Sequence, residues 1–381
     1  MNMSINRPKF QTVTILLFSW GSSFADGYQF GATYTGKFLS NVSGGIETGS
    51  VYLDNLSATL DVDVSEAWGF GSGRLFAHGL YNNGTMFSDE FVGDFQVVSN
   101  IEAGHAFRLY EIWYELSNQR WSVRAGLYDL NSEFDTNDVS DLFLNSSHGI
   151  GADIGQTGKN GPSIFPVTSL AVRGDVKFEN VGLRAAVLDG VPGDPNKPSR
   201  TAIDLDDDDG ILSIAEVDVP FGEKSRFWSG VWRYSGEFDR LYLNGTSNRN
   251  EGWYAGIETR ADLGGRTVAG FMRYGQANDQ LNAADDYFGA GFVVVAPVSS
   301  RPDDRLGVAV ATIRVGQPYR ESLEQLDPNV RHREISWEFT YRAKINDHLT
   351  LQPDIQLIQN PSALSTIDNA IIVGLRFEIA Y

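Results

Sequence analysis

The sequence of 381 residues contains no cysteine. Disulfides, thiol catalysis and thiolate metal sites are therefore excluded. The five histidines are too scattered to have the spacing of metal ligands; they are His78, His105, His148, His332 and His348. Neither a G-x-S-x-G motif nor a phosphate-binding P-loop motif occurs. These absences predict that the protein is not an enzyme and carries no bound cofactor.

Positive charge and long apolar segments are also scarce. The chain has 30 Lys and Arg against 49 Asp and Glu, which gives a formal net charge of −19. This balance disfavours nucleic acid as a partner, because nucleic-acid-binding proteins present basic surfaces. After residue 25, no stretch approaches the roughly 20 continuous apolar residues of a membrane helix. A membrane location would therefore require a β-barrel.

The N-terminal segment has the layout of a secretory signal. Arg7 and Lys9 precede a short apolar segment at residues 12–20 (TVTILLFSW), and Ser23 and Ala25 supply the small residues of a cleavage site. We therefore expect a signal peptide at residues 1–25 and a mature domain at residues 26–381.

The dominant signal in the rest of the chain is strict alternation of apolar and polar residues. In residues 55–64 (NLSATLDVDV) and 335–345 (ISWEFTYRAKI), one face is apolar and the other polar. Such segments run ten residues or more, against about five or six in globular sheets. Polar faces with both charge signs and apolar faces with aromatic ends are typical of outer-membrane barrels. The pattern predicts an all-β transmembrane β-barrel.

Strand and loop lengths agree with this prediction. The alternating segments number sixteen, an even number, at 28–38, 49–64, 70–81, 106–116, 121–128, 167–178, 181–188, 211–219, 225–236, 252–263, 266–275, 287–297, 304–316, 332–345, 349–359 and 368–381. Connections after odd-numbered segments are long and those after even-numbered segments are short. Outer-membrane barrels sort their external loops and periplasmic turns in this way. We expect 16 antiparallel strands, with both termini in the periplasm.

The polar faces predict which residues line the pore. The candidates on the third, fourth and fifth segments are Arg74, His78, Glu111, Trp113, Glu115 and Arg124. Charges of both signs keep a passage wet, and an aromatic ring among them offers a face to the C–H groups of a sugar. An alternative is that these charges only pair across neighbouring strands and hold the lumen open.

The longest connection, residues 129–166, is expected to be functional. A barrel of this strand number has a wide lumen, and a loop folded inward narrows it. Long loops in compact domains are usually functional or disordered. Phe134, Leu142, Phe143 and Ile164 argue against disorder, because they need a surface on which to be buried. We expect this segment to be a constriction loop inside the lumen.

Several stretches resemble the carbohydrate-selective porins of the OprB family. They are GATYTGKFLSNVSGG (31–45), RLYEIWYE (108–115), VRAGLYDLNSEFDTNDVSDLFLNSS (123–147) and LQPDIQLIQNP (351–361). The resemblance implies a sixteen-stranded channel for passive uptake of glucose and related sugars in the outer membrane of a Gram-negative bacterium. It also places Glu111, Glu115 and Arg124 near the constriction. The chain ends in Tyr381, and an aromatic C-terminus resembles the signal that barrel-assembly machinery recognises.

Other functions and partners stay open at this point. A general or ion-selective porin without sugar preference is the main alternative, since arginine-rich lumens can favour anions. Outer-membrane lipid and lipopolysaccharide are expected to surround the barrel, and sixteen strands are compatible with a homotrimer.

The acidic stretch DLDDDDGILSIAE (204–216) resembles a calcium loop. Asp207, Asp209 and Glu216 match the positions of ligands, but Leu205 occupies the first one. The stretch is therefore expected to be a solvated acidic external loop. Weak Ca²⁺ binding at Asp207 and Asp209, bridging to lipopolysaccharide phosphates, is the alternative hypothesis.

Overall fold

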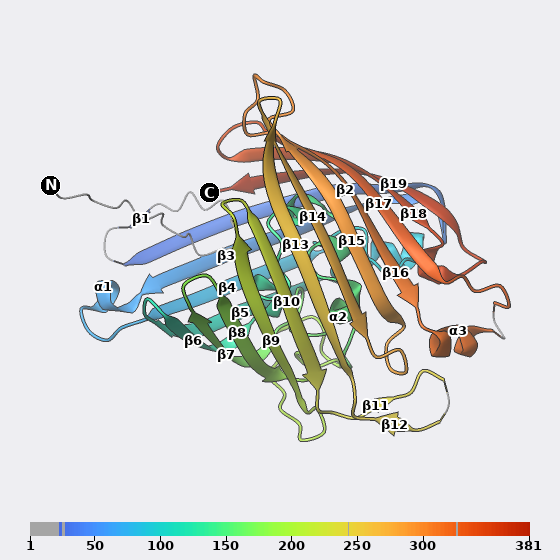
Figure 1. The fold of residues 1–381 in the computed structure, drawn as a ribbon, viewed down its shortest axis with the longest axis horizontal. Helices are drawn as coiled ribbons and strands as arrows, with labels where there is room; N and C mark the ends of the chain where they lie inside the picture. The colour runs from blue at the N-terminus through green and yellow to red at the C-terminus, as the bar shows by residue number, and fades with distance from the viewer. Residues whose placement is uncertain (1–22, 25–26, 243, 325–326) are drawn as a thin grey trace.

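Sixteen long antiparallel strands close into one barrel in the computed structural model, which describes residues 23–24, 27–242, 244–324 and 327–381 (Figure 1). Strand β19 pairs with β2, and β9 pairs with β10, so the ring is complete. The predicted sixteen-stranded barrel is thereby confirmed. The strands are β2 (Tyr28–Gly45), β3 (Gly49–Asp63), β4 (Arg74–Asn83), β5 (Ala106–Ser117), β6 (Trp121–Tyr128), β7 (Ser169–Lys177), β8 (Gly182–Asp189), β9 (Ile211–Phe221), β10 (Ser225–Tyr234), β13 (Glu251–Leu263), β14 (Arg266–Ala277), β15 (Ala284–Val295), β16 (Arg305–Val315), β17 (Arg333–Lys344), β18 (Leu349–Gln359) and β19 (Asp368–Ala380).

Short strands and helices lie before β2 and in the connections between the barrel strands. The two-residue strand β1 (Ser23–Phe24) pairs with the start of β2; apart from it, the predicted signal peptide at residues 1–25 lies outside the described residues. Strands β11 (Phe238–Asp239) and β12 (Thr246–Ser247) form a hairpin in the connection between β10 and β13. The helices are α1 (Val64–Trp68), α2 (Ala152–Gly155) and α3 (Gln317–Leu323). No helix in the described part of the chain is long and apolar enough to cross a membrane.

Two strand boundaries differ from the sequence expectation by four residues or more. β2 continues to Gly45 instead of ending at residue 38, so its connection to β3 is only residues 46–48. β4 begins at Arg74 instead of residue 70. The cause is local, because α1 is followed by Gly69, Gly71 and Gly73, which all have positive φ and break an extended chain. The long-loop and short-turn alternation therefore fails at these two connections.

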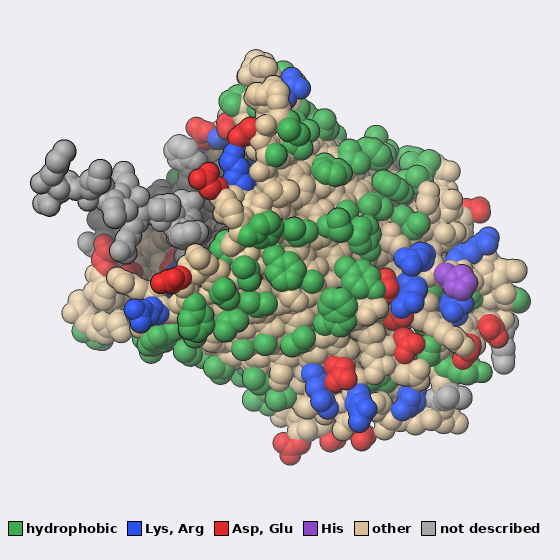
Figure 2. All heavy atoms as spheres, in the orientation of Figure 1, with side chains coloured by type: hydrophobic (Ala, Val, Ile, Leu, Met, Phe, Trp, Pro, Cys, Tyr) green, Lys and Arg blue, Asp and Glu red, His purple; other side chains and the backbone are tan. Residues whose placement is uncertain are grey.

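The outer surface of the barrel carries an apolar band. In Figure 2, hydrophobic side chains cover the middle of the wall and charged side chains gather towards its ends. Trp337 and Phe339 on β17 are 38% and 49% exposed, whereas Ser336 and Glu338 between them are fully buried on the inner side. Alternation along the strand thus directs apolar groups outward, as it does in barrels surrounded by lipid.

The hydrophobic core lies inside the barrel, between the inner wall and two long connections. The connection at residues 84–105 buries Phe87, Val92 and Val98 against inward side chains of β2, β3, β18 and β19. The connection at residues 129–168 buries Phe134 against one side of the wall and Leu142 and Phe143 against another. Both connections therefore pack against the lumen wall.

Inward-facing glutamates of three strands, β9, β13 and β17, bind the backbone of the 129–168 connection. Glu216 of β9 accepts a hydrogen bond from the backbone N–H of Asp135 at 2.8 Å. Glu258 of β13 accepts from the N–H of Val139 at 3.2 Å. Glu338 of β17 accepts from Leu144 and Asn145 at 2.7 and 2.9 Å. A hydrogen bond of this kind contributes about 0.5–1.5 kcal/mol net, so the three strands hold the loop along its length.

Candidate functional site

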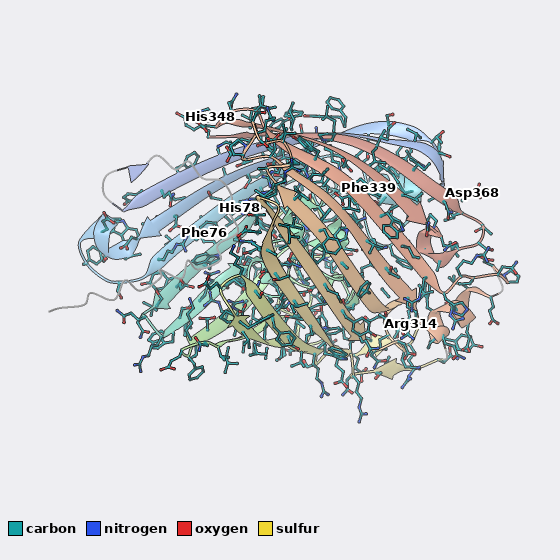
Figure 3. All side chains as sticks on the ribbon, turned by 45° about the horizontal axis from the view of Figure 1, so that its top comes forward. Phe76, His78, Arg314, Phe339, His348 and Asp368 are labelled. Carbon is teal, nitrogen blue, oxygen red and sulfur yellow. The ribbon has the colours of Figure 1, made fainter. Side chains whose placement is uncertain are left out.

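The six residues predicted to line the pore lie side by side on β4, β5 and β6. Register explains why they meet: Arg74 pairs with Glu115 and His78 with Glu111 across β4 and β5, and Glu115 pairs with Arg124 across β5 and β6. Ile112 and Tyr114, which alternate with them on β5, are 40% and 39% exposed on the outer side. Figure 3 shows His78 on the same strand as Phe76, with His348 and Arg314 marking opposite ends of the barrel.

Trp113 is at the centre of this group and is only 5% exposed. The ring of Phe76 stacks on it at a centroid distance of 4.9 Å. The guanidinium of Arg124 lies 3.7 Å from its ring centroid, a cation–π contact. Since these two groups cover the indole faces, little of Trp113 is left to stack on a ligand. Its contacts instead fix the position of Arg124.

Arg124 belongs to a buried network of arginines and glutamates. Arg124 binds Glu115 at 3.0 Å and Glu133 at 3.2 Å. Arg173 of β7 contacts the same two carboxylates. Glu133 comes from the 129–168 connection, so the network joins that connection to the wall. Burial alone would raise the pKa of Glu133, but Arg124, Arg173 and Arg184 outweigh it and lower the pKa to about 2.

His78 and Arg74 lie at the two ends of the predicted group. Nε2 of His78 is 2.6 Å from the hydroxyl of Ser57, and its Nδ1 is 3.8 Å from Glu111. Arg74, whose side chain is 42% exposed, forms an ion pair with Asp61. His78 thus faces an open part of the lumen, whereas Arg74 belongs to a partly solvated pair where β4 begins.

The sequence reasoning missed the role of the connection at residues 84–105. Glu334 of β17 accepts hydrogen bonds from the N–H groups of Phe95 and Gln96, at 2.9 and 3.2 Å. The carbonyl of Val98 accepts from the amide of Gln356 at 2.8 Å. The sequence could have indicated this packing, because apolar residues in a long loop need a surface on which to be buried. In this connection those residues are Phe87, Val92 and Val98.

A cavity of about 420 Å³ lies in the lumen below these two connections, on the side of the C-terminus. Asn100 and Asp141 of the two connections line it, as do His348 and Ala380. The part of the wall on β3 and β4, here called the neutral wall, carries neutral polar groups, among them Asn55, Ser57 and His78. The part on β16, β17 and β19, here called the arginine wall, carries Arg305, Arg342, Lys344 and Arg376. Of the six predicted residues, His78 alone lines this cavity. Arg305, Arg342 and Lys344 were absent from the residues predicted to line the pore.

The acidic stretch lies away from this cavity. Asp207 is exposed and Asp209 is half-buried, both in the connection between β8 and β9. The main-chain carbonyl of Asp208 accepts a hydrogen bond from Lys159 at 3.0 Å. Within the described ranges, no three His, Asp or Glu side chains converge as ligands for a metal ion. Weak Ca²⁺ binding by this stretch stays a prediction.

Known proteins resemble the chain over almost its whole length. Residues 47–381 match the family described as "Carbohydrate-selective porin, OprB family". Porin B of Pseudomonas aeruginosa is 19% identical, over 96% of this chain and 91% of its own length.

Solved structures show the same architecture. The high-pH structure of Pseudomonas putida OprB has a TM-score of 0.83 at 17% identity, over 93% of this chain and 94% of that chain. A triple mutant of the Rhodopseudomonas blastica porin has a TM-score of 0.56 at 8% identity, over 93% and 100%. At these identities the likeness establishes the fold.

Proposed function

Because this chain belongs to the carbohydrate-selective porin, OprB family, we propose that it carries glucose and related sugars by passive diffusion through a water-filled lumen. The observation that supports this proposal most is the position of the 129–168 connection, which three wall glutamates hold by its backbone. A loop fixed in this way narrows the passage without closing it. A narrow passage with fixed polar groups is what distinguishes a selective porin from a wide one.

Sugar passage through such a lumen needs no energy input. Each hydroxyl of a sugar exchanges water for a fixed donor or acceptor, so that desolvation is offset step by step. His78, Ser57 and Asn55 face the cavity and are the proposed contacts on the neutral wall. Glu111, Trp113, Glu115 and Arg124 are proposed to shape the passage, since they are mostly buried against one another. Arg74 is proposed to contact sugar where the strand begins.

The family and the fold point to the outer membrane of a Gram-negative bacterium. We place both termini and the 420 Å³ cavity on the periplasmic side, with the acidic 190–210 connection outside. Lipopolysaccharide, the barrel-assembly machinery and two further copies of the chain are the proposed partners. The proposed homotrimer is tested by chemical crosslinking in native membranes, where a single monomeric species would contradict it.

A general or ion-selective porin is the second candidate. It is favoured by the extent of ion pairing, because paired charges such as Arg124 with Glu115 can hold a lumen open without binding any solute.

Single-channel currents in planar bilayers distinguish the two candidates. We expect glucose to block the ion current of the full chain in a saturable, concentration-dependent way. Current that falls only in proportion to solution conductivity, for every sugar tested, would identify a general porin.

A histidine variant tests the proposed contact. His78→Ala removes one hydrogen-bonding group, worth about 0.5–1.5 kcal/mol, and we expect it to raise the half-blocking glucose concentration about two- to tenfold. His105→Ala is the matched control, because His105 is exposed and contacts Tyr81 instead of the cavity. An equal effect of both variants would contradict a specific role for His78.

A further inference from the structure

The carboxylates that line the cavity already have cationic partners. Glu378 lies 3.2 Å from Arg342 and 3.8 Å from Arg376. Asp141 lies 3.9 Å from Arg342. At the rim, Asp303 and Asp347 both lie within 4 Å of Lys344. Each of these carboxylates is therefore at least partly neutralised within the wall.

Arg305 differs from its neighbours on this wall. It is the first residue of β16, it lines the cavity, and its side chain is half-buried. Among the described residues, no carboxylate lies within 4.0 Å of the Arg305 guanidinium; Asp141 and Asp138 act on it from a longer distance. Its cross-strand partner is Arg342. Like charges at directly opposite positions destabilise a sheet, so an anion between them relieves the repulsion.

The chemistry of the site defines the class of anion. A guanidinium presents a planar fork of N–H donors that matches a carboxylate. The neutral wall of the same cavity presents hydroxyl, amide and imidazole groups from Ser57, Asn55 and His78, which suit the hydroxyls of a polyol. The volume of about 420 Å³ lies within the roughly 300–1,000 Å³ of small-molecule sites. A ligand with a carboxylate at one end and hydroxyls along the rest satisfies both walls.

We propose that Arg305, together with Arg342, docks the carboxylate of sugar acids such as aldonates and uronates as they pass through the lumen. This proposal rests on the proposed passage of sugars and extends it to an anionic class. The carboxylate binds the free guanidinium of Arg305, and the hydroxyls reach the neutral wall. Arg342 contributes its positive field while it stays paired with Glu378.

Current block by gluconate, glucose and acetate in planar bilayers tests the site. Each is added as a potassium salt or a neutral sugar to a constant potassium chloride background, with the full chain as the channel. We expect gluconate to block at concentrations about tenfold below those of glucose, which corresponds to ~1.4 kcal/mol. Acetate is expected to block no better than chloride, because it lacks the hydroxyls.

Variants of Arg305 test whether the tighter block by gluconate depends on this side chain. Arg305→Gln should raise the half-blocking gluconate concentration about tenfold and change that of glucose less than twofold. Arg305→Lys keeps the charge but loses the fork, and should fall between the wild type and Arg305→Gln. Arg233→Gln is the matched control, since Arg233 lies on the exposed side of β10 and forms its ion pair with exposed Glu251. Heat-shifted gel mobility checks that each barrel is folded.

The outcomes separate this proposal from the proposed function. Block by glucose without tighter block by gluconate, or an unchanged gluconate response in Arg305→Gln, overturns the sugar-acid site alone. Block by acetate equal to that by gluconate also overturns it, because the site would then be a simple anion site. Absence of block by every sugar overturns the proposed passage of sugars as well.

Discussion

Glu133 is contacted by one arginine from each of three neighbouring strands. Arg124 of β6 and Arg173 of β7 bind its carboxylate, and Arg184 of β8 donates to its main-chain carbonyl. The folded protein thereby lowers the pKa of Glu133 from 4.5 to about 2. Because the folded-state pKa lies below the unfolded value, the stabilisation is complete above about pH 4.5 and is lost as the pH falls towards 2.

Glu133→Gln should remove this pH-dependent contribution. The variant leaves arginines without their shared partner, and removing one partner of a buried ion pair costs about 3–5 kcal/mol. We therefore expect a lower free energy of unfolding at pH 7 and a smaller difference between wild type and variant near pH 2. Urea unfolding across this pH range measures both.

An exposed pair gives the control for that measurement. Glu251→Gln breaks the pair with Arg233, in which both side chains are about half exposed. Surface pairs contribute about 0–1 kcal/mol, so this variant should unfold almost like the wild type. A loss at Glu251 as large as that at Glu133 would contradict the proposed role of the buried network.

The 129–168 connection is attached to the wall by an ionic cluster as well as by backbone hydrogen bonds. Arg273 of β14 binds Asp135 at 2.8 Å and also forms an ion pair with Asp153, and all three side chains are buried. Burial raises the pKa of Asp153 to about 6, in spite of the opposing effect of Arg273. Above that pH the carboxylate is ionised and depends on the arginine for compensation.

Arg273→Met should release this part of the connection. The variant leaves two buried carboxylates uncompensated, so we expect a larger single-channel conductance, weaker block by glucose and faster proteolysis of the connection. The defect should be greater at pH 8 than at pH 5, since a protonated Asp153 costs less to bury. Adding Asp135→Asn and Asp153→Asn should restore most of the wild-type conductance. An increase that is independent of pH would contradict the ionic explanation.

Strands and connections could be predicted from the sequence where the pattern that identifies them lies within the element itself. Alternation revealed all sixteen strands, because each strand separates a lipid-facing side from a polar side along its own length. The end of β2 was missed because the alternation breaks at Leu39, an apolar residue that is buried on the inner side, and only Val42 is apolar in the SNVSGG that follows. The contacts of the 84–105 connection were missed because they are distant in sequence; Gln96 and Glu334 are 238 residues apart. The six residues predicted to line the pore lie together on β4 to β6, because local register brings them side by side. Arg305 on β16 is distant from them in sequence, and only the closed ring of strands places it in the same lumen.

The whole molecule is organised inside out compared with a soluble protein. Its apolar side chains form an outer band (Figure 2). Its buried charges and inner core lie within the barrel. Water cannot favour such an outer surface, because exposed apolar patches of this extent drive association. A lipid bilayer removes that penalty.

Phe339→Arg tests this arrangement. Phe339 lies near the middle of β17 and points outward (Figure 3). An arginine at the bilayer midplane costs about 2–4 kcal/mol in such barrels, so the variant should fold into vesicles less stably by at least this amount. Phe339→Leu, which keeps an apolar group, is the control. Equal stability of the two variants in vesicles, measured by urea titration, would contradict a lipid-facing position.

The attachment of the 129–168 connection through its backbone has a consequence for evolvability. Glu216, Glu258 and Glu338 hold main-chain N–H groups, and every amino acid except proline supplies one. The scaffold thus fixes the path of the loop but not the identity of solvent-facing positions such as Asp138 and Asp141. Substitutions at those positions can therefore change which solutes pass, while the backbone hydrogen bonds that hold the loop in the barrel are kept. Natural selection or protein engineering can alter the selectivity of the channel in this way.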